Sequence, residues 1–210
     1  YVTQKPFTPA VASRLLTLAA DLSVAAAIVG GAAGLGLRLI GRLHLPGISR
    51  AERLGLGTLL GMGTLSLLWL TLGLAGLARR SVGLVVTVVL LAAAIPVLRQ
   101  WLRNKPPGLY ALPRPLRGYL IVMLGLSLLH TLVPATDWDG LSYHLAAPAR
   151  WAALGRIGWI GAEGPFYYPH LLEVLFLPAM LLRSDSAARL LHWTFYPLVL
   201  WLVGDLTHGF

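Results

Sequence analysis

Hydrophobic residues in this chain form long blocks, unlike the alternating or one-sided stripes of soluble strands and helices. A helix needs roughly 20 apolar residues to cross the hydrocarbon core of a bilayer. Six blocks approach or exceed that length, although the third and the fifth are short. They comprise residues 15–40, 54–78, 82–98, 118–133, 169–182 and 187–206. We therefore predict an all-α, polytopic transmembrane protein with about six spanning helices.

A further helix is expected at residues 141–154, where apolar residues are interspersed with small and polar ones. Its leucines and Trp151 suit a helix along the membrane interface, with aromatic rings at headgroup depth. This interfacial helix lies within residues 134–168, the longest segment between two predicted spans.

Composition agrees with a membrane protein, because 57% of the residues are hydrophobic and only 12% are charged. The net charge of +9 comes from basic residues in short loops between the apolar blocks. That distribution is typical of cytoplasmic loops, so we expect a lipid bilayer as partner and no nucleic acid. The 210 residues contain no cysteine, which excludes disulfides, thiolate metal sites and cysteine nucleophiles in them.

The basic residues also predict an orientation. If the loops after the first, third and fifth blocks share one side, that side carries eleven basic residues and the other carries six. The richer side is expected to be cytoplasmic, which puts the loop 134–168 on the outer side of a multi-pass protein.

Proline and arginine divide the chain. Residues 104–117 contain four prolines and a basic fringe, and they predict a cytoplasmic linker. An N-terminal three-helix transmembrane block, residues 1–103, precedes it, and a second transmembrane part, residues 118–210, follows. In the first block, the pairs Gly30/Gly34 and Gly57/Gly61 have a spacing that allows close helix packing.

The outer loop carries the candidate chemistry. The stretch Asp137-Trp-Asp-Gly-Leu-Ser-Tyr-His144 holds two of the eight acidic residues of the chain. Carboxylates at a membrane surface are costly unless they bind or catalyse something. Asp137 and Asp139 can hold a divalent cation together, or one of them can act as a general base. The alternative for Asp139 is a structural one, as the N-cap of the interfacial helix.

Other polar residues near this loop are candidates for substrate binding, with structural alternatives. The aromatic residues around His170 can form an aromatic belt at the membrane interface. The helix dipole favours the negative charge of Glu173 in the first turn of its helix. His130 and His192 lie on apolar helices, where a core position is the simpler explanation. The substrate-binding candidates are Tyr143, His144, Arg150, Arg156, Tyr168, His170 and Glu173.

The order of these motifs resembles a known family. A spanning helix is followed by Asp-x-x-x-Tyr in an outer loop and by an interfacial helix that ends in glycine. Tyr-Tyr-Pro-His-Leu-Leu-Glu then starts one helix, and Ser184-Asp-Ser-Ala-Ala-Arg-Leu-Leu191 starts the next. Over residues 118–206 this order is similar to the C-type (GT-C) membrane glycosyltransferases, and in particular to bacterial relatives of protein mannosyltransferases and lipid-A sugar transferases.

The resemblance implies an enzyme of the bacterial cytoplasmic membrane that transfers a sugar from a polyprenyl-phosphate donor at the outer face. It places Asp139 at the catalytic acidic position, as base or as metal ligand, and Tyr143 at the aromatic position. Arg150 and Arg156 would pair with the lipid-linked phosphate. The second acid that the family carries directly after the first is here Gly140, for which Asp137 is a substitute.

The alternative is a non-catalytic transmembrane subunit or scaffold of a larger membrane complex, respiratory or photosynthetic, with other membrane subunits as partners. Gly140 in place of a second acid and the glycine-rich helices favour it. GT-C enzymes usually continue through more helices after the sixth block. The resemblance therefore implies that the chain is part of a longer enzyme.

Overall fold

The computed structural model of the chain describes residues 9–43, 45–103, 113–160 and 170–208. Every regular element in these ranges is a helix, which confirms the all-α prediction. The helices are α1 (Pro9–Arg42), α2 (Arg50–Leu74), α3 (Arg80–Arg103), α4 (Arg114–Leu132), the π-helix η1 (Gly140–His144), α5 (Ala146–Leu154), α6 (Leu171–Leu182), α7 (Asp185–Trp193) and α8 (Phe195–His208).

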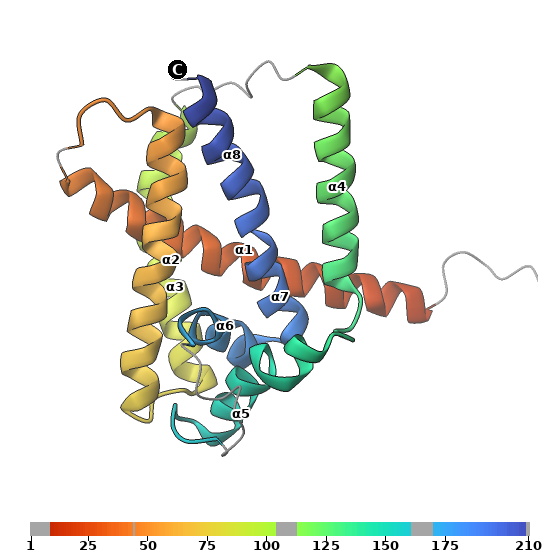
Figure 1. The fold of residues 1–210 in the computed structure, drawn as a ribbon. Helices are drawn as coiled ribbons and strands as arrows, with labels where there is room; N and C mark the ends of the chain where they lie inside the picture. The colour runs from red at the N-terminus through yellow and green to blue at the C-terminus, as the bar shows by residue number, and fades with distance from the viewer. Residues whose placement is uncertain (1–8, 44, 104–112, 161–169, 209–210) are drawn as a thin grey trace, which may run out of the picture.

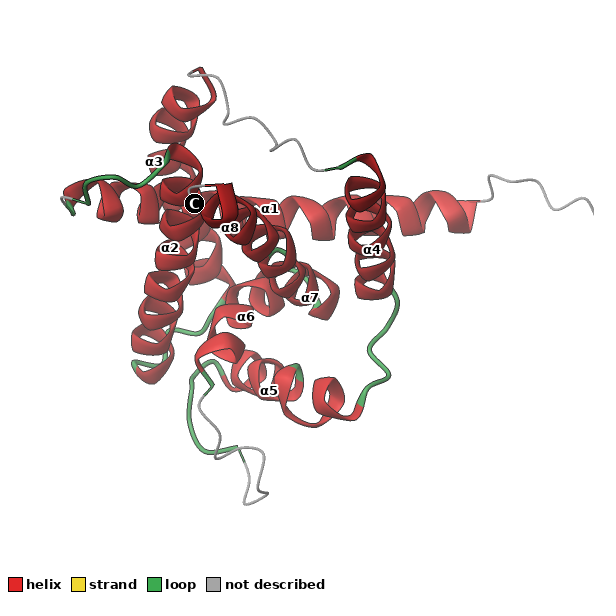
Figure 2. Cartoon of the chain, turned by 45° about the horizontal axis from the view of Figure 1, so that its top comes forward, coloured by secondary structure: helices red, strands yellow, loops and turns green. Residues whose placement is uncertain are grey.

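Four of these helices, α1 to α4, are long and apolar enough to cross a membrane. They match the first four predicted blocks, and they support a lipid bilayer as the environment of the chain. In Figures 1 and 2, α1 runs across the upright helices α2 and α3, while α4 stands apart from them.

The fifth block differs from the expectation of a spanning helix. It forms α6, whose 12 residues make a helix about 18 Å long. That is well short of the roughly 30 Å of hydrocarbon. Instead of crossing, α6 packs against α2 and α5 at the lower end of the bundle in Figure 1.

The sixth block is divided into α7 and α8 at Thr194. Pro197 explains the division, because a proline has no backbone N–H to donate to the carbonyl of Trp193. The N–H of Thr194 still bonds to the carbonyls of Leu190 and Leu191, each at 3.2 Å, so the break is confined to the junction. α7 and α8 lead from the end that carries α5 toward the opposite end (Figure 1).

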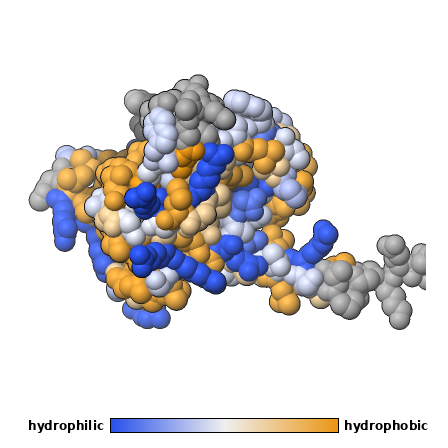
Figure 3. Space-filling model, turned by 90° about the horizontal axis from the view of Figure 1, so that it is seen from below, coloured by the Kyte–Doolittle hydropathy of each residue, from blue (hydrophilic) through white to orange (hydrophobic). Residues whose placement is uncertain are grey.

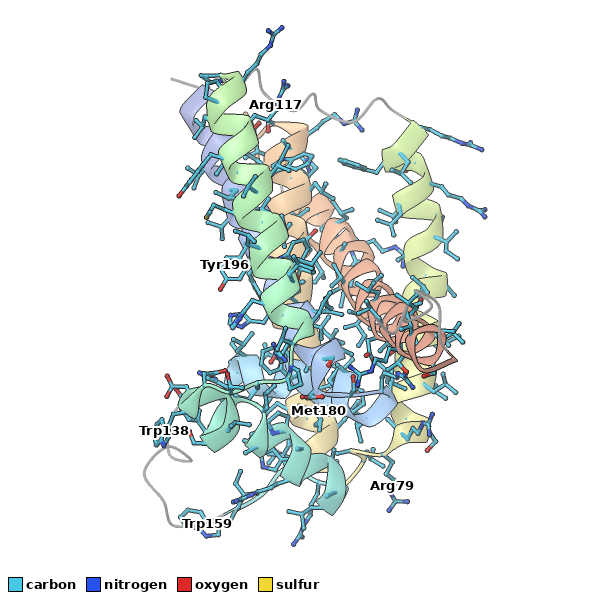
Figure 4. All side chains as sticks on the ribbon, turned by 90° about the vertical axis from the view of Figure 1, so that its right-hand side faces the viewer. Arg79, Arg117, Trp138, Trp159, Met180 and Tyr196 are labelled. Atoms are coloured by element: carbon cyan, nitrogen blue, oxygen red, sulfur yellow. The ribbon has the colours of Figure 1, made fainter. Side chains whose placement is uncertain are left out.

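The loop between α4 and α6, predicted to be the outer one, and the α2–α3 turn lie at the same end of the bundle. The backbone N–H of Ala78 donates to the carbonyl of Gly155 at 3.1 Å, and that of Ile157 donates to Gly73 at 2.9 Å. Figure 4 accordingly shows Arg79 and Trp159 at one end and Arg117 at the other.

Two arginines that the count of basic residues assigned to the side of Arg117 have other positions. Arg189 donates hydrogen bonds to the carbonyls of His130 and Val133, at the end of α4 where the outer loop begins. Arg183 donates to the carboxylate of Asp21 in α1. The predicted excess of positive charge at the end opposite the loop is therefore smaller than the sequence count, because α6 is too short to carry these arginines to that end.

The core joins both predicted halves of the chain. One hydrophobic cluster contains Trp69 of α2, Leu177 of α6 and Leu191 of α7, all at most 1% exposed. Apolar side chains of α3 and α4, such as Val85 and Ile121, point outward. From below, the end of the bundle shows a mixture of hydrophilic and hydrophobic side chains (Figure 3).

The small residues on α1 and α2 pack as predicted. A Cβ atom at Gly61 would overlap the carbonyl of Ala32, and one at Gly57 would contact Leu37. Gly34 faces α3 instead, because a Cβ there would overlap Ala94. The glycines thus allow α1 to approach two helices at once.

Candidate functional site

Asp137 caps the helical segment that follows α4. Helical backbone begins at Trp138, and the Asp137 carboxylate accepts a hydrogen bond from the N–H of Gly140 at 2.6 Å. That bond lowers the pKa of the Asp137 carboxyl below its ordinary value of 3.8. Asp139 itself has helical φ and ψ angles of −63° and −45° and makes no side-chain capping bond. The prediction of Asp139 as N-cap was therefore wrong by two residues.

The predicted interfacial helix has two parts. The five residues of η1 are wound as a π-helix, in which the N–H of Leu145 donates to the carbonyl of Gly140 at 3.0 Å. α5 follows and ends at Gly155, whose φ of 69° requires glycine. Single π turns are rare and occur frequently at functional sites. Tyr143 and His144 are the last two residues of this π turn.

Glu173, in the first turn of α6, is bonded to one histidine and lies close to a second. Its Oε1 lies 2.5 Å from Nδ1 of His144, whereas its Oε2 lies 3.5 Å from Nδ1 of His170, and these two atoms form no hydrogen bond with each other. The Glu173 side chain is only 4% exposed, whereas that of His144 is 38% exposed. A buried carboxylate is costly unless it is paired, so this cluster links η1 firmly to α6.

Aromatic rings enclose the cluster. Tyr143 packs on His144 with 4.1 Å between ring centroids, and the edge of His170 meets Trp151 at 5.6 Å. Trp151 is fixed by its own hydrogen bond, because its Nε1 donates to the carbonyl of Gly158 at 3.1 Å. The imidazole rings therefore have little freedom to rotate.

A cleft of about 270 Å³ opens beside this cluster, between the end of α4, η1, α6 and the α7–α8 junction. Its polar lining includes a carboxylate, a guanidinium and imidazole rings, and its apolar lining combines aromatic and aliphatic side chains. Tyr196 lies on α8 above the end that carries Trp138 and Trp159 (Figure 4). The lining residues that bear on function are Asp137, His144, Phe176, Arg189, His192 and Tyr196.

The sequence identified only part of this cleft. It singled out Asp137 and His144 as candidates, and both contribute to the lining. It assigned no binding role to Arg189, and it interpreted His130 and His192 as core residues. No local pattern marks these three residues, because α4 and α7 are brought together only by the tertiary fold.

The other predicted residues have varied positions. Asp139 and Arg156 are exposed and do not line the cleft. Arg150 donates to the carbonyl of Ile160 at 2.8 Å, so its guanidinium is partly engaged within the loop. Tyr168 lies outside the described residues.

A divalent cation finds little support in this loop. One oxygen of Asp137, Oδ2, already accepts the Gly140 N–H, so fewer of its lone pairs remain for a cation. Within the described parts of the chain, no three His, Cys, Asp or Glu side chains are grouped so that they could hold a metal ion. The Asp137–Asp139 metal site therefore stays a prediction.

Comparisons with protein-family models, with curated proteins and with solved structures find no match for this chain. A proposal about function therefore has to rest on the residues and on their geometry.

Proposed function

We propose that this chain belongs to a C-type membrane glycosyltransferase, which transfers a sugar from a polyprenyl-phosphate donor. The observation that supports the proposal most is the position of Asp139. Asp139 is exposed and lies between α4 and the π turn of η1. Five residues later comes His144, which lines the cleft and is bonded to the buried Glu173. The Asp-x-x-x-Tyr order of the resemblance coincides with that turn.

Of the two carboxylates Asp137 and Asp139, we assign the role of general base to Asp139. Asp137 is engaged as an N-cap, whereas no hydrogen bond to the Asp139 carboxylate occurs within the described ranges. As general base, Asp139 takes the proton of an acceptor hydroxyl. The acceptor oxygen then bonds to the anomeric carbon. The bond from that carbon to the phosphate oxygen breaks, and its electron pair leaves with the polyprenyl phosphate.

The surroundings of the cleft suit an amphiphilic donor. Outward-facing apolar residues of α4 and α8, among them Leu129 and Val199, lie on helices that line the cleft. A prenyl chain can lie against such a surface while its phosphate stays near the polar lining, because hydrocarbon favours contact with apolar side chains.

The test is sugar transfer by the full-length protein in detergent or liposomes, with a polyprenyl-phosphate sugar as donor. Asp139→Asn removes the base with almost no change in shape, and we expect transfer to fall roughly 100- to 10,000-fold. Asp185→Asn is the matched control, because Asp185 is exposed in the first turn of α7 and does not line the cleft. We expect its rate to stay within about twofold of the wild type.

Equal rates in the wild type and in Asp139→Asn would sink the proposal. Protein that is folded but transfers no sugar from any polyprenyl-phosphate donor would favour the alternative, a non-catalytic subunit of a membrane complex. Stoichiometric co-purification with other membrane subunits would then be the expected finding.

The proposed outer location of the loop has its own test. A Cβ atom at Gly158 or at Gly118 would meet no other atom within 4 Å, so both positions tolerate a cysteine. The 210 residues contain no other cysteine. In intact cells, a membrane-impermeant maleimide is expected to label Gly158→Cys and to leave Gly118→Cys unlabelled until the membrane is opened. The reverse pattern would place the loop in the cytoplasm.

A further inference from the structure

The cleft contains a histidine whose two ring nitrogens have different surroundings. Nδ1 of His144 lies 2.5 Å from the buried Glu173 carboxylate, while the same ring contributes to the wall of the cleft. We propose that His144 binds the phosphate of a prenyl phosphate through Nε2, and that Glu173 is the positioning residue that holds the imidazole for this contact.

Glu173 fixes the imidazole in two ways. A carboxylate is acceptor-only when ionised, so Nδ1 has to carry the proton of the hydrogen bond between them. Nε2 is then the nitrogen left for the cleft. The ring is also held by Tyr143, whose centroid lies 4.1 Å away. A carboxylate that orients a histidine in this way is a common device in active sites and metal sites.

A phosphate suits the remaining nitrogen. Protonated His144 would have one anion at each N–H, with Glu173 at Nδ1 and the phosphate at Nε2, and charge-assisted hydrogen bonds of this kind are the stronger ones. Arg189 adds a positive charge to the same wall. Its guanidinium donates to two carbonyls at the end of α4, and it retains further N–H donors because arginine has more than two.

The opposing negative charge in the cleft is small. Asp137 is the carboxylate of the lining, and its Oδ2 already accepts the Gly140 N–H. The buried Glu173 faces His144 and His170 rather than forming part of the lining. An anion that enters the cleft therefore meets more donors than acceptors.

The apolar part of the cleft indicates that the phosphate is attached to a hydrocarbon chain. Phe176, Trp193 and Tyr196 continue the lining from α6 onto the α7–α8 junction. Tyr196 lies on α8, and its side chain is 53% exposed. A free phosphate would not contact these aromatic rings, whereas the tail of a prenyl phosphate can cover them.

Several titratable or charged groups surround His144, and the pH dependence of binding involves all of them. Glu173 and His170 face it from α6, and Tyr143 from η1. The remaining groups lie across the cleft, on the loop, α4 and α7. They are Asp137, His130, Arg189 and His192.

This inference rests on the proposed function for its chemistry. When the bond between the anomeric carbon and the phosphate oxygen breaks, its electron pair stays on that oxygen. The Nε2–H of His144 stabilises the resulting charge, while the proton of the acceptor hydroxyl goes to Asp139. His144 is thus a catalytic residue on the donor side, and Asp139 acts on the acceptor side.

Binding of farnesyl phosphate to the full-length protein tests the inference without any turnover. Farnesol, which has the same tail and no phosphate, is the comparison ligand. We expect His144→Asn and His144→Gln to weaken farnesyl phosphate binding roughly 10- to 100-fold, the usual value of a hydrogen bond to a charged group. Farnesol binding should change less than about twofold, because the tail contacts remain. Glu173→Gln should weaken farnesyl phosphate by a smaller factor.

The pH profile separates positioning from a purely structural role. A neutral imidazole that donates its Nδ1–H to Glu173 has no proton on Nε2, so wild-type affinity should fall relative to His144→Asn as the pH rises. Glu173→Gln should change that profile. If His192→Asn abolishes the pH dependence and His144→Asn keeps it, His192 is the phosphate ligand and the inference is wrong.

Other outcomes would also overturn the inference. These are unchanged farnesyl phosphate binding in both His144 variants, an equal loss of farnesol binding, or displacement of farnesyl phosphate by phosphatidylglycerol vesicles or inorganic phosphate at equal concentration. Failure of the proposed function looks different. Binding would then depend on His144 as described, but sugar transfer would be absent or insensitive to Asp139→Asn.

Discussion

Arg183, in the turn between α6 and α7, donates a hydrogen bond through Nε to the carboxylate of Asp21 in α1 at 2.9 Å. Ser184 donates to the same oxygen at 2.8 Å. Asp21 is only 4% exposed, so these partners offset the cost of burying its carboxylate. The pair ties the first helix of the chain to the segment that precedes α7.

Removing one partner of this pair is expected to destabilise the protein more than removing both. Arg183→Leu leaves a buried carboxylate with one hydroxyl, and we expect a loss of about 3 kcal/mol in the free energy of unfolding. Asp21→Asn combined with Arg183→Leu should recover part of that loss. Thermal unfolding in detergent of the two single variants and the double variant measures the coupling, and strictly additive losses would contradict it.

The Asp137 cap is expected to depend on pH. Because the folded-state pKa is below the ordinary value of 3.8, the stabilisation is complete above that value and is lost as the pH falls through the folded-state pKa. Asp137→Ala should lose about 1 kcal/mol at neutral pH, and Asp137→Asn only a few tenths, because asparagine is an equally good N-cap. The difference in melting temperature between the wild type and Asp137→Ala should shrink in strong acid, because a protonated carboxyl is a weaker acceptor than a carboxylate. A constant difference at all pH values would show that the carboxylate is not the cap.

Gly61 and Gly63 provide a matched pair on one helix. A Cβ at Gly61 would overlap the carbonyl of Ala32, whereas a Cβ at Gly63 meets no atom within 4 Å. Gly61→Ala is expected to destabilise the α1–α2 contact by about 1–3 kcal/mol. Gly63→Ala should be neutral or slightly stabilising, because alanine favours helix over glycine. The measurement is the free energy of unfolding of both variants in detergent. Equal stability of Gly61→Ala and Gly63→Ala would contradict the close approach of the two helices.

Trp138 and Trp159 are expected to lie at the depth of the lipid headgroups. Their exposed fractions are 69% and 70%, and both lie at the end that carries the outer loop (Figure 4). Tryptophan is enriched at that depth because its ring is apolar and its N–H is polar. In variants that retain a single tryptophan, brominated lipids should quench Trp138 and Trp159 most strongly near the headgroups. Trp69, which is 0% exposed, is the unquenched control. Equal quenching of Trp69 would contradict the burial.

The apolar blocks of the sequence determined the helical fold class and the first four long helices. Block length and hydropathy suffice there, because a lipid-facing helix satisfies its backbone hydrogen bonds internally and requires only apolar side chains. The same reasoning failed to describe α6. Its composition is apolar because it is buried between other helices, and hydropathy does not distinguish a buried helix from a spanning one.

The loop from Asp137 to His144 was recognisable from its acidic and aromatic residues alone, but the roles within it were not. Whether Asp137 or Asp139 caps the helix depends on where helical backbone begins, and a shift of two residues exchanges the two carboxylates. The pairing of His144 with Glu173 spans 29 residues, and the approach of Arg189 to the end of α4 spans 59. Only the packing of α6 and α7 against α4 and η1 brings those groups to one cleft, because contacts between distant segments leave no periodic signal in the chain.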